Sequence, residues 1–109
     1  MKQWVERRAE VNGARLAVFE FDEPVSIEPA SIELGRSARG ATVDDRPTVV
    51  FVHGWPDTHH VWTEVARRLA DDVRVVAYDT RGLGSSDSPR GVSAYRIETL
   101  ADDLYAVAE

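Results

Sequence analysis

The sequence predicts one small α/β domain, and three observations support this prediction. A hairpin pattern occupies the first 21 residues, an apolar run rich in β-branched residues follows at Thr48–Val52, and helix-like and strand-like segments then alternate. Such alternation is typical of a partly parallel sheet covered by helices. A chain of 109 residues suits a single unit of this kind, spanning 1–109.

The first predicted element is an antiparallel β-hairpin. Apolar and polar residues alternate loosely from Trp4 to Val11. Asn12-Gly13 follows, and the segment from Arg15 to Phe21 is again strand-like. Asn-Gly between two such runs is the strongest short-range hairpin signal, because both residues accept a positive φ. Residues 22–46 are rich in Pro, Gly and charge, which predicts an irregular loop with a short strand at Ser31–Leu34.

The next predicted unit is a strand, a helix and a second strand. The strand Thr48–Val52 is a short, mostly apolar run rich in β-branched residues, as expected for a strand buried on both faces. Helical spacing of apolar residues predicts a helix from Thr58 to Ala70, and Val73–Tyr78 reads as a further buried strand. This order predicts a right-handed crossover joining two parallel strands.

A last helix is predicted near the end of the sequence. Ser93 is the expected N-cap. The apolar positions that mark this helix are Ile97, Leu100, Ala101, Leu104 and Ala108.

Composition excludes several classes of function. A net charge of -6, from 19 acidic and 13 basic residues, disfavours a nucleic-acid partner. The sequence has no cysteine, so it forms no disulfide or thiolate metal cage, and a reducing cytoplasm is the expected compartment. No secretory signal opens the chain, and no run approaches the roughly 20 apolar residues of a membrane span.

The block His53-Gly54-Trp55-Pro56, directly after the strand Thr48–Val52, points to anion stabilisation. A strand that ends at His-Gly and turns sharply through Pro leaves backbone N–H groups free to face a developing oxyanion. Such donors provide the largest single electrostatic contribution in acyl-transfer chemistry. Asp57, just after this block, is expected to cap the following helix.

Together with the segment Asp79–Asp87, this block resembles the N-terminal part of the α/β-hydrolase fold. The resemblance covers nearly the whole chain but less than half of that fold, so the predicted sheet is incomplete. Trp62, six residues after Pro56, matches a spacing common among epoxide hydrolases and haloalkane dehalogenases.

The resemblance implies roles for the block. The backbone N–H of Trp55 would be one oxyanion-hole donor, Gly54 would allow the close turn, and His53 would be structural rather than the catalytic base. The peptide bond between Trp55 and Pro56 would be cis.

The resemblance also implies that Asp79 and Arg81 brace the loop after the second parallel strand. An active-site role for Asp79 is the alternative, because this residue stands at the carboxyl end of a strand. Arg81 is expected to pair with a nearby carboxylate.

The residues needed for catalytic turnover in this fold are missing from this sequence. Neither G-x-S-x-G nor G-x-D-x-G occurs, and the acid partner and late catalytic His are also absent. The chain is therefore expected to be a catalytically silent fragment. The complete protein would use a Ser or Asp nucleophile on a small-molecule epoxide, ester or carbon–halogen bond, and no cofactor is implied.

The family's sheet order would place Thr48–Val52 beside a strand that this sequence does not contain. An apolar strand with unpaired backbone groups invites pairing with another chain. We therefore expect the isolated polypeptide to be marginally stable or to self-associate through this strand.

Other functions remain open from the sequence. Gly82-Leu83-Gly84 suggests a nucleotide-binding loop, although Asp87 stands where G-x-G-x-x-G needs glycine. A noncatalytic interaction module and a decayed gene product are further alternatives. Zinc binding is disfavoured, because His59 and His60 are neighbours expected on different faces of a helix.

Overall fold

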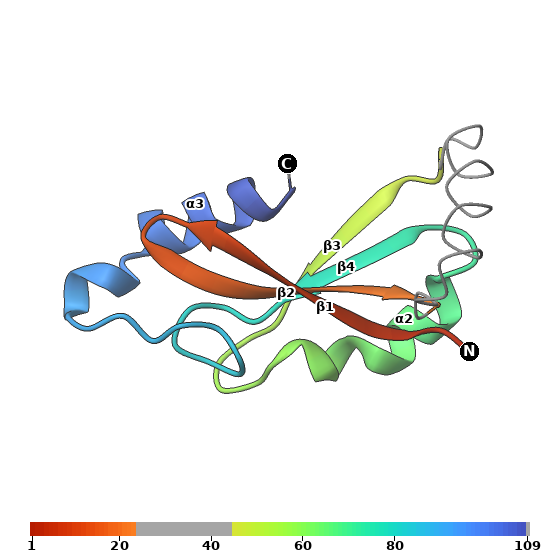
Figure 1. Cartoon of the computed structure of the whole chain (residues 1–109), viewed down its shortest axis with the longest axis horizontal. Coiled ribbons are helices and arrows are strands. Elements are labelled where there is room, and N and C mark those ends of the chain that lie inside the picture. Colours follow the sequence, from red (N-terminus) through yellow and green to blue (C-terminus); the bar gives the residue numbers. More distant parts are fainter. Residues whose placement is uncertain (24–44, 109) are drawn as a thin grey trace, which may run out of the picture.

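The computed structural model describes residues 1–23 and 45–108, which form a four-stranded mixed sheet with helices (Figure 1). The strands are β1 (Gln3–Val11), β2 (Ala14–Asp22), β3 (Thr48–Val52) and β4 (Arg74–Tyr78), in the spatial order β1-β2-β4-β3. β2 pairs antiparallel with β1 and with β4, whereas β3 and β4 are parallel. The predicted α/β class and the parallel strand pair are confirmed.

The hairpin is also confirmed. Asn12 and Gly13 have φ values of 49° and 76°, the left-handed conformations of a type I′ turn, and Val11 pairs directly with Ala14. The irregular loop was expected to begin at Asp22, but Asp22 is the last residue of β2. Residues 24–44, with the short strand expected at Ser31–Leu34, lie outside the described part of the chain.

The helix predicted after β3 is present, but it begins as a 3₁₀ turn. η1 (His59–Trp62) leads into α2 (Thr63–Leu69). The prediction that Asp57 caps it is wrong, because the Thr58 side chain accepts from the backbone N–H of His60. Asp57 instead donates its own N–H to the carbonyl oxygen of Gly54, at 2.8 Å, and so closes the preceding turn.

The last helix is α3 (Ile97–Ala108), which follows the 3₁₀ turn η2 (Val92–Tyr95). The prediction that Ser93 caps α3 is wrong. Ser93 lies inside η2, and the extended residue Arg96, with ψ of 150°, separates that turn from α3.

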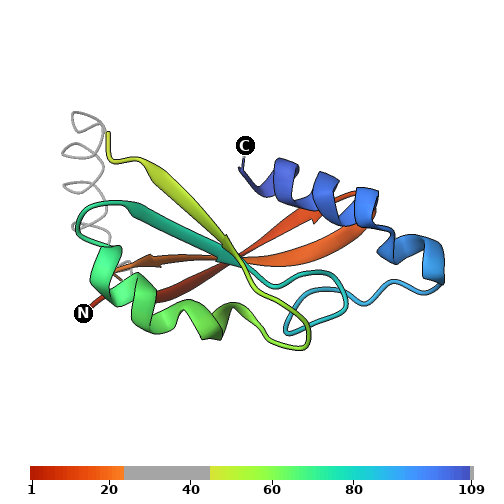
Figure 2. The ribbon, with the colours of Figure 1, turned by 180° about the vertical axis from the view of Figure 1, so that it is seen from behind.

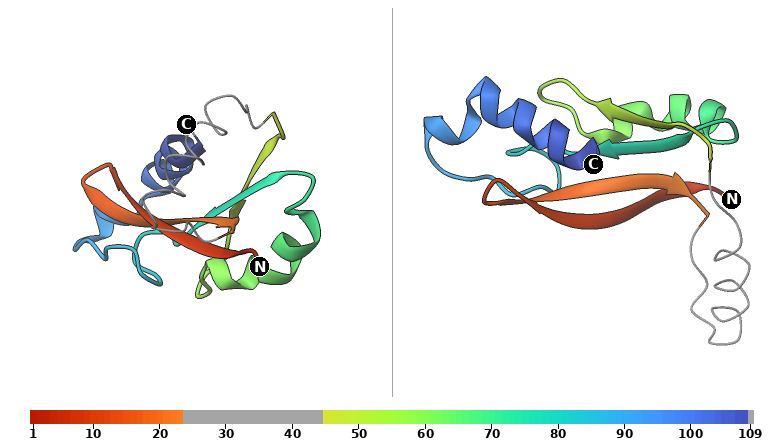
Figure 3. Two further views of the ribbon diagram at one scale, coloured as in Figure 1. Left: turned by 45° about the vertical axis from the view of Figure 1, so that its right-hand side comes forward. Right: turned by 90° about the horizontal axis from the view of Figure 1, so that it is seen from above.

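The helices cover opposite faces of the sheet and lie toward different ends of it (Figures 2 and 3). Val50 and Val107 pack against the core on the α3 face. Phe51 packs with Ala66 of α2 on the other face. Successive residues of β3 thus point to opposite faces, as the pleat of a strand requires.

None of the helices within the described residues has the length and apolarity needed to cross a bilayer.

Candidate functional site

The loop after β3 is fastened to the end of β4 through His53. This buried ring accepts a hydrogen bond at Nε2 from the backbone N–H of Thr80, at 3.0 Å, and its Nδ1 lies 3.0 Å from the carbonyl oxygen of Gly54. Because a carbonyl can only accept, Nδ1 carries the proton and Nε2 does not. Both ring nitrogens are thereby engaged in holding the loop in place.

Trp55 presents an unused backbone donor at this loop. The Trp55–Pro56 peptide bond is cis, as expected, and the indole is 84% exposed. Across residues 1–23 and 45–108, no group accepts from the Trp55 N–H. Its neighbour Gly54 has open space where a Cβ would lie, so the described residues give no steric reason for glycine there.

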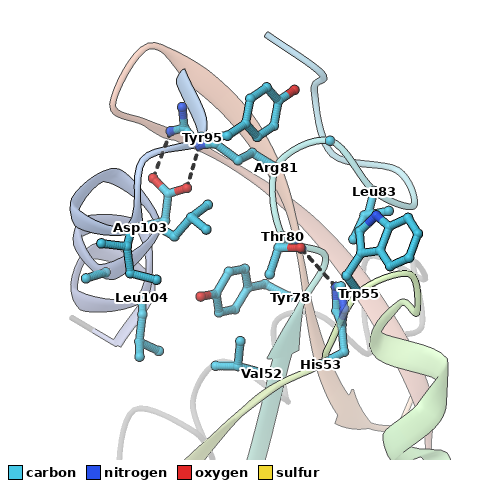
Figure 4. A pocket seen from close by; sticks show the side chains of 14 residues that line it. Val52, His53, Trp55, Tyr78, Thr80, Arg81, Leu83, Tyr95, Asp103 and Leu104 are labelled. Atoms are coloured by element: carbon cyan, nitrogen blue, oxygen red, sulfur yellow. Dashed lines mark hydrogen bonds and ion pairs between the residues drawn. The ribbon is translucent and has the colours of Figure 1, made fainter. Parts of the chain in front are cut away.

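A cleft of about 560 Å³ opens beside Trp55, between the carboxyl ends of β3 and β4 and the helix α3 (Figure 4). Its walls are mostly apolar, with Val52, Leu83 and Leu104 among the lining residues. Tyr78 also lines it, and burial raises the pKa of that phenol to about 12, so its hydroxyl keeps its proton at neutral pH. The cleft therefore offers apolar surface, the neutral hydroxyl of Tyr78 and, at one end, the ion pair of Arg81 with Asp103.

Asp79, at the end of β4, is a buried bracing residue. Its Oδ1 accepts from the backbone N–H and from Nδ1 of His59, each at 2.8 Å, and its Oδ2 accepts from the backbone N–H of Ser85 at 3.0 Å. Burial alone would raise the pKa of Asp79, but hydrogen bonds from Ser85 and His59 lower it. The expectation that Asp79 braces its loop is confirmed.

The partner of Asp79, His59, was not foreseen as such from the sequence. Its ring stacks on Phe19 with centroids 3.5 Å apart and meets Trp4 edge-on. Burial lowers the pKa of His59, against the opposing effect of its bond to Asp79. At neutral pH the His59 ring is therefore uncharged, and its Nδ1–H donates to the carboxylate of Asp79.

Arg81 joins the loop after β4 to α3 through a buried ion pair. Its Nε and Nη2 donate to the two carboxylate oxygens of Asp103, at 2.7 and 2.8 Å, and its Nη1 donates to the carbonyl oxygen of Ala94. The hydrogen bonds to Asp103 raise the pKa of Arg81. Asn12, in the hairpin turn, also donates to Asp103. The predicted pairing of Arg81 with a carboxylate is confirmed.

The loop considered for nucleotide binding already uses its donors internally. The N–H of Gly82 bonds to the carbonyl oxygen of Asp87, that of Leu83 to Thr80, and that of Ser85 to Asp79. A phosphate-binding loop needs such groups free to face the ligand. This geometry gives no support to the nucleotide-binding alternative.

The expected separation of His59 and His60 is wrong, since their ring centroids lie 4.1 Å apart. The residues turn through a 3₁₀ segment rather than a regular α-helix. In the described part of the chain, no three His, Cys, Asp or Glu side chains gather as metal ligands would.

A family model described as "alpha/beta hydrolase fold" matches residues 47–109, more than half of the chain. The chain belongs to the α/β-hydrolase fold family. Its strands and helices form an incomplete version of that fold.

Named relatives place this α/β-hydrolase chain in the epoxide hydrolase-like branch. Epoxide hydrolase A of Mycobacterium tuberculosis is 33% identical over 105 residues, which cover 95% of this chain and 26% of that protein. The "Probable oxidoreductase EphD" of the same species is 51% identical over 63 residues, covering 58% of this chain and 11% of that protein. The crystal structure of Epoxide Hydrolase A from Mycobacterium thermoresistibile superposes with a TM-score of 0.70 at 31% identity, covering 94% of this chain and 26% of that one. The chain thus spans about a quarter or less of the length of these relatives.

Proposed function

We propose that residues 53–56 form the oxyanion-stabilising loop of an epoxide hydrolase-like α/β-hydrolase, with the backbone N–H of Trp55 as donor. The observation that carries this proposal is that this N–H is unpaired within the described residues, in a residue that lines the cleft. In the complete protein the substrate would be a small-molecule epoxide, with an ester or a carbon–halogen bond as the wider class.

The proposed chemistry places negative charge beside Trp55. A Ser or Asp nucleophile outside this sequence attacks the substrate, and water then releases the covalent intermediate. When water attacks an ester intermediate, the carbonyl oxygen of that ester becomes an oxyanion. A fixed N–H stabilises this oxyanion, because no reorganisation is needed when the charge appears.

His53 acts in this proposal by positioning rather than by proton transfer. Both of its ring nitrogens are occupied by Thr80 and Gly54, so the ring holds the loop to β4 and has no free site for a proton from substrate. Pro56 follows the donor and turns the chain toward η1. The proposed reaction needs no cofactor, and the cytoplasmic location expected from the sequence stays a prediction.

A chimera tests the donor role. The 105 aligned residues of Epoxide hydrolase A of M. tuberculosis would be replaced by this chain, and hydrolysis of an aryl epoxide would be followed. We expect activity in the chimera and none in the 109-residue chain alone. Trp55→Pro, which removes the N–H, should lower kcat by about 10²- to 10³-fold with little change in KM.

The matched control is Trp55→Phe, which keeps the backbone N–H and an aromatic side chain and should retain kcat within about fivefold, since surface-exposed replacements cost little. A folded chimera without epoxide hydrolysis would contradict the proposed function. Equal rates for Trp55→Pro and Trp55→Phe would leave the family assignment intact and exclude Trp55 as the donor.

A further inference from the structure

The loop that carries Trp55 is anchored at both of its ends to two consecutive residues. At its start, Nε2 of His53 accepts a hydrogen bond from the backbone N–H of Thr80, at 3.0 Å (Figure 4). At its end, Oδ1 of Asp79 accepts from the backbone N–H and from Nδ1 of His59, each at 2.8 Å. Because Thr80 follows Asp79 directly at the end of β4, both anchors are attached to the same point of the sheet.

The segment between these anchors has few other contacts that could fix its direction. In the described part of the chain, residues 54–58 form hydrogen bonds only with one another, with His53 and with η1. The side chain of Trp55 stands in solvent and packs little. A short loop that is fixed at both ends samples far fewer conformations than a loop fixed at one end. The direction of the Trp55 N–H therefore depends on both anchors.

The second anchor is rigid on both sides of its hydrogen bond. The ring of His59 is only 4% exposed and stacks on Phe19, which fixes the plane of the ring. Asp79 is 1% exposed, and its Oδ2 is held by the backbone N–H of Ser85. Because an ionised carboxylate can only accept, Nδ1 of His59 carries the proton in this bond. The bond therefore joins two groups that cannot easily move apart.

We propose that His59 is a positioning residue of the oxyanion-stabilising loop. Its Nδ1–H, bonded to Asp79, holds residues 54–58 so that the Trp55 N–H is directed into the cleft. His59 acts through Asp79 rather than on the substrate, and it acts through its hydrogen bond rather than through the packing of its ring. This inference rests on the proposed function, because it gives His59 a part in oxyanion stabilisation by Trp55.

Two replacements separate the hydrogen bond from the packing. His59→Phe keeps an aromatic ring against Phe19 but removes the donor. His59→Asn removes the ring but keeps a donor, because its Nδ2 is the same number of bonds from Cα as Nδ1 of His. In His59→Phe the backbone N–H groups of residues 59 and 85 still bind the Asp79 carboxylate, so the buried charge keeps partners.

The order of the loop can be measured in the 109-residue chain by ¹⁵N relaxation. We expect order parameters of about 0.85 for the backbone amides of residues 54–58 in the wild type and in His59→Asn, and values below about 0.6 in His59→Phe. His60→Phe, the same replacement at the exposed neighbouring residue, is the control and should match the wild type. A rigid loop in His59→Phe, or a loosened loop in His59→Asn, would overturn the proposal.

Catalysis in the chimera with Epoxide hydrolase A provides the second test. His59→Phe should lower kcat by about 10- to 100-fold with no rise in KM, because the oxyanion forms only after the substrate has bound. His59→Asn should return kcat to near the wild-type value. The opposite order, with His59→Phe active and His59→Asn impaired, would show that ring packing is what matters and would overturn the proposal.

These experiments distinguish a failure of this inference from a failure of the proposed function. A folded chimera without epoxide hydrolysis would overturn the proposed function and the positioning role of His59 together. An active chimera in which His59→Phe keeps the wild-type kcat would overturn the role of His59 alone.

Discussion

At Gly84 the loop after β4 passes directly over the carboxylate of Asp79. Gly84 has a φ of +54°, and a Cβ at this position would overlap Oδ2 of Asp79. That oxygen already accepts from Ser85. The backbone conformation and the close contact therefore both require glycine here.

We predict that Gly84→Ala lowers the free energy of unfolding by about 2 kcal/mol or more, from backbone strain and from overpacking. Urea unfolding followed by far-ultraviolet circular dichroism measures this change. Gly13→Ala is the matched control, because Gly13 also has a positive φ, of +76°, but has no atom within 4 Å of a built Cβ. Gly13→Ala should lower the free energy of unfolding by only about 1 kcal/mol. Equal costs at the two positions would show that the contact with Asp79 is unimportant.

Individual contacts were the part of the site that the sequence predicted least well. Asp57 and Thr58 are adjacent residues that both suit an N-cap, and only the turn closed by the Asp57 N–H decides that Thr58 takes the role. The bond between His59 and Asp79 joins residues 20 positions apart on different elements. No local pattern signals such a pair, because the sheet brings the two residues together.

At the scale of elements, the ion pair between Arg81 and Asp103 connects the loop after β4 to α3. Both side chains are only 2% exposed, and Asp103 also binds Asn12 of the hairpin turn. Removing one member of a buried pair leaves the other charged, buried and without its partner, which costs far more than removing both.

We predict that Asp103→Ala lowers the free energy of unfolding by about 3–5 kcal/mol. The double replacement Arg81→Met with Asp103→Leu should recover most of this loss, because apolar side chains of similar volume carry no desolvation cost. Denaturant unfolding of Arg81→Met, of Asp103→Leu and of the double variant gives the coupling energy. Additive losses would mean that the two side chains stabilise the fold independently.

Elements with a strong local signal were predicted well, and those without one were not. Asn12-Gly13 fixes the hairpin because both residues accept a positive φ. The turns η1 and η2 contain four residues each, too few to show a helical period. The antiparallel pairing of β2 with β4 is a contact between segments far apart in the sequence, which local patterns do not determine.

For the molecule as a whole, the buried pair His59–Asp79 links stability to pH. The pKa of folded His59 lies below 6.5, so below that pH the unfolded chain takes up a proton that the folded chain resists, and stability falls. The pKa of folded Asp79 lies below 3.8, so its contribution is present above that pH and is lost as pH falls through the folded value. Both effects destabilise the fold in acid.

We predict that stability declines from pH 6.5 downward, with His59 contributing a slope of up to about 1.4 kcal/mol per pH unit. His59→Gln should flatten the decline between pH 6.5 and about pH 5, the range where histidine titrates. His60→Gln keeps the bond between His59 and Asp79 and removes only the minor effect of His60 on the His59 pKa, so it serves as the control. Urea midpoints across this range provide the measurement, and an unchanged slope in His59→Gln would contradict the assignment.

Because the Trp55 indole is exposed, its fluorescence can report on occupancy of the cleft. The other two indoles pack against rings, Trp4 edge-on to Phe21 and Trp62 stacked with Phe51, while that of Trp55 stands in solvent at the cleft. Collisional quenchers such as acrylamide should quench the fluorescence of Trp55 more strongly than that of the other two tryptophans. Any compound that enters the cleft would then shield this emission, so occupancy can be read without a label and without turnover.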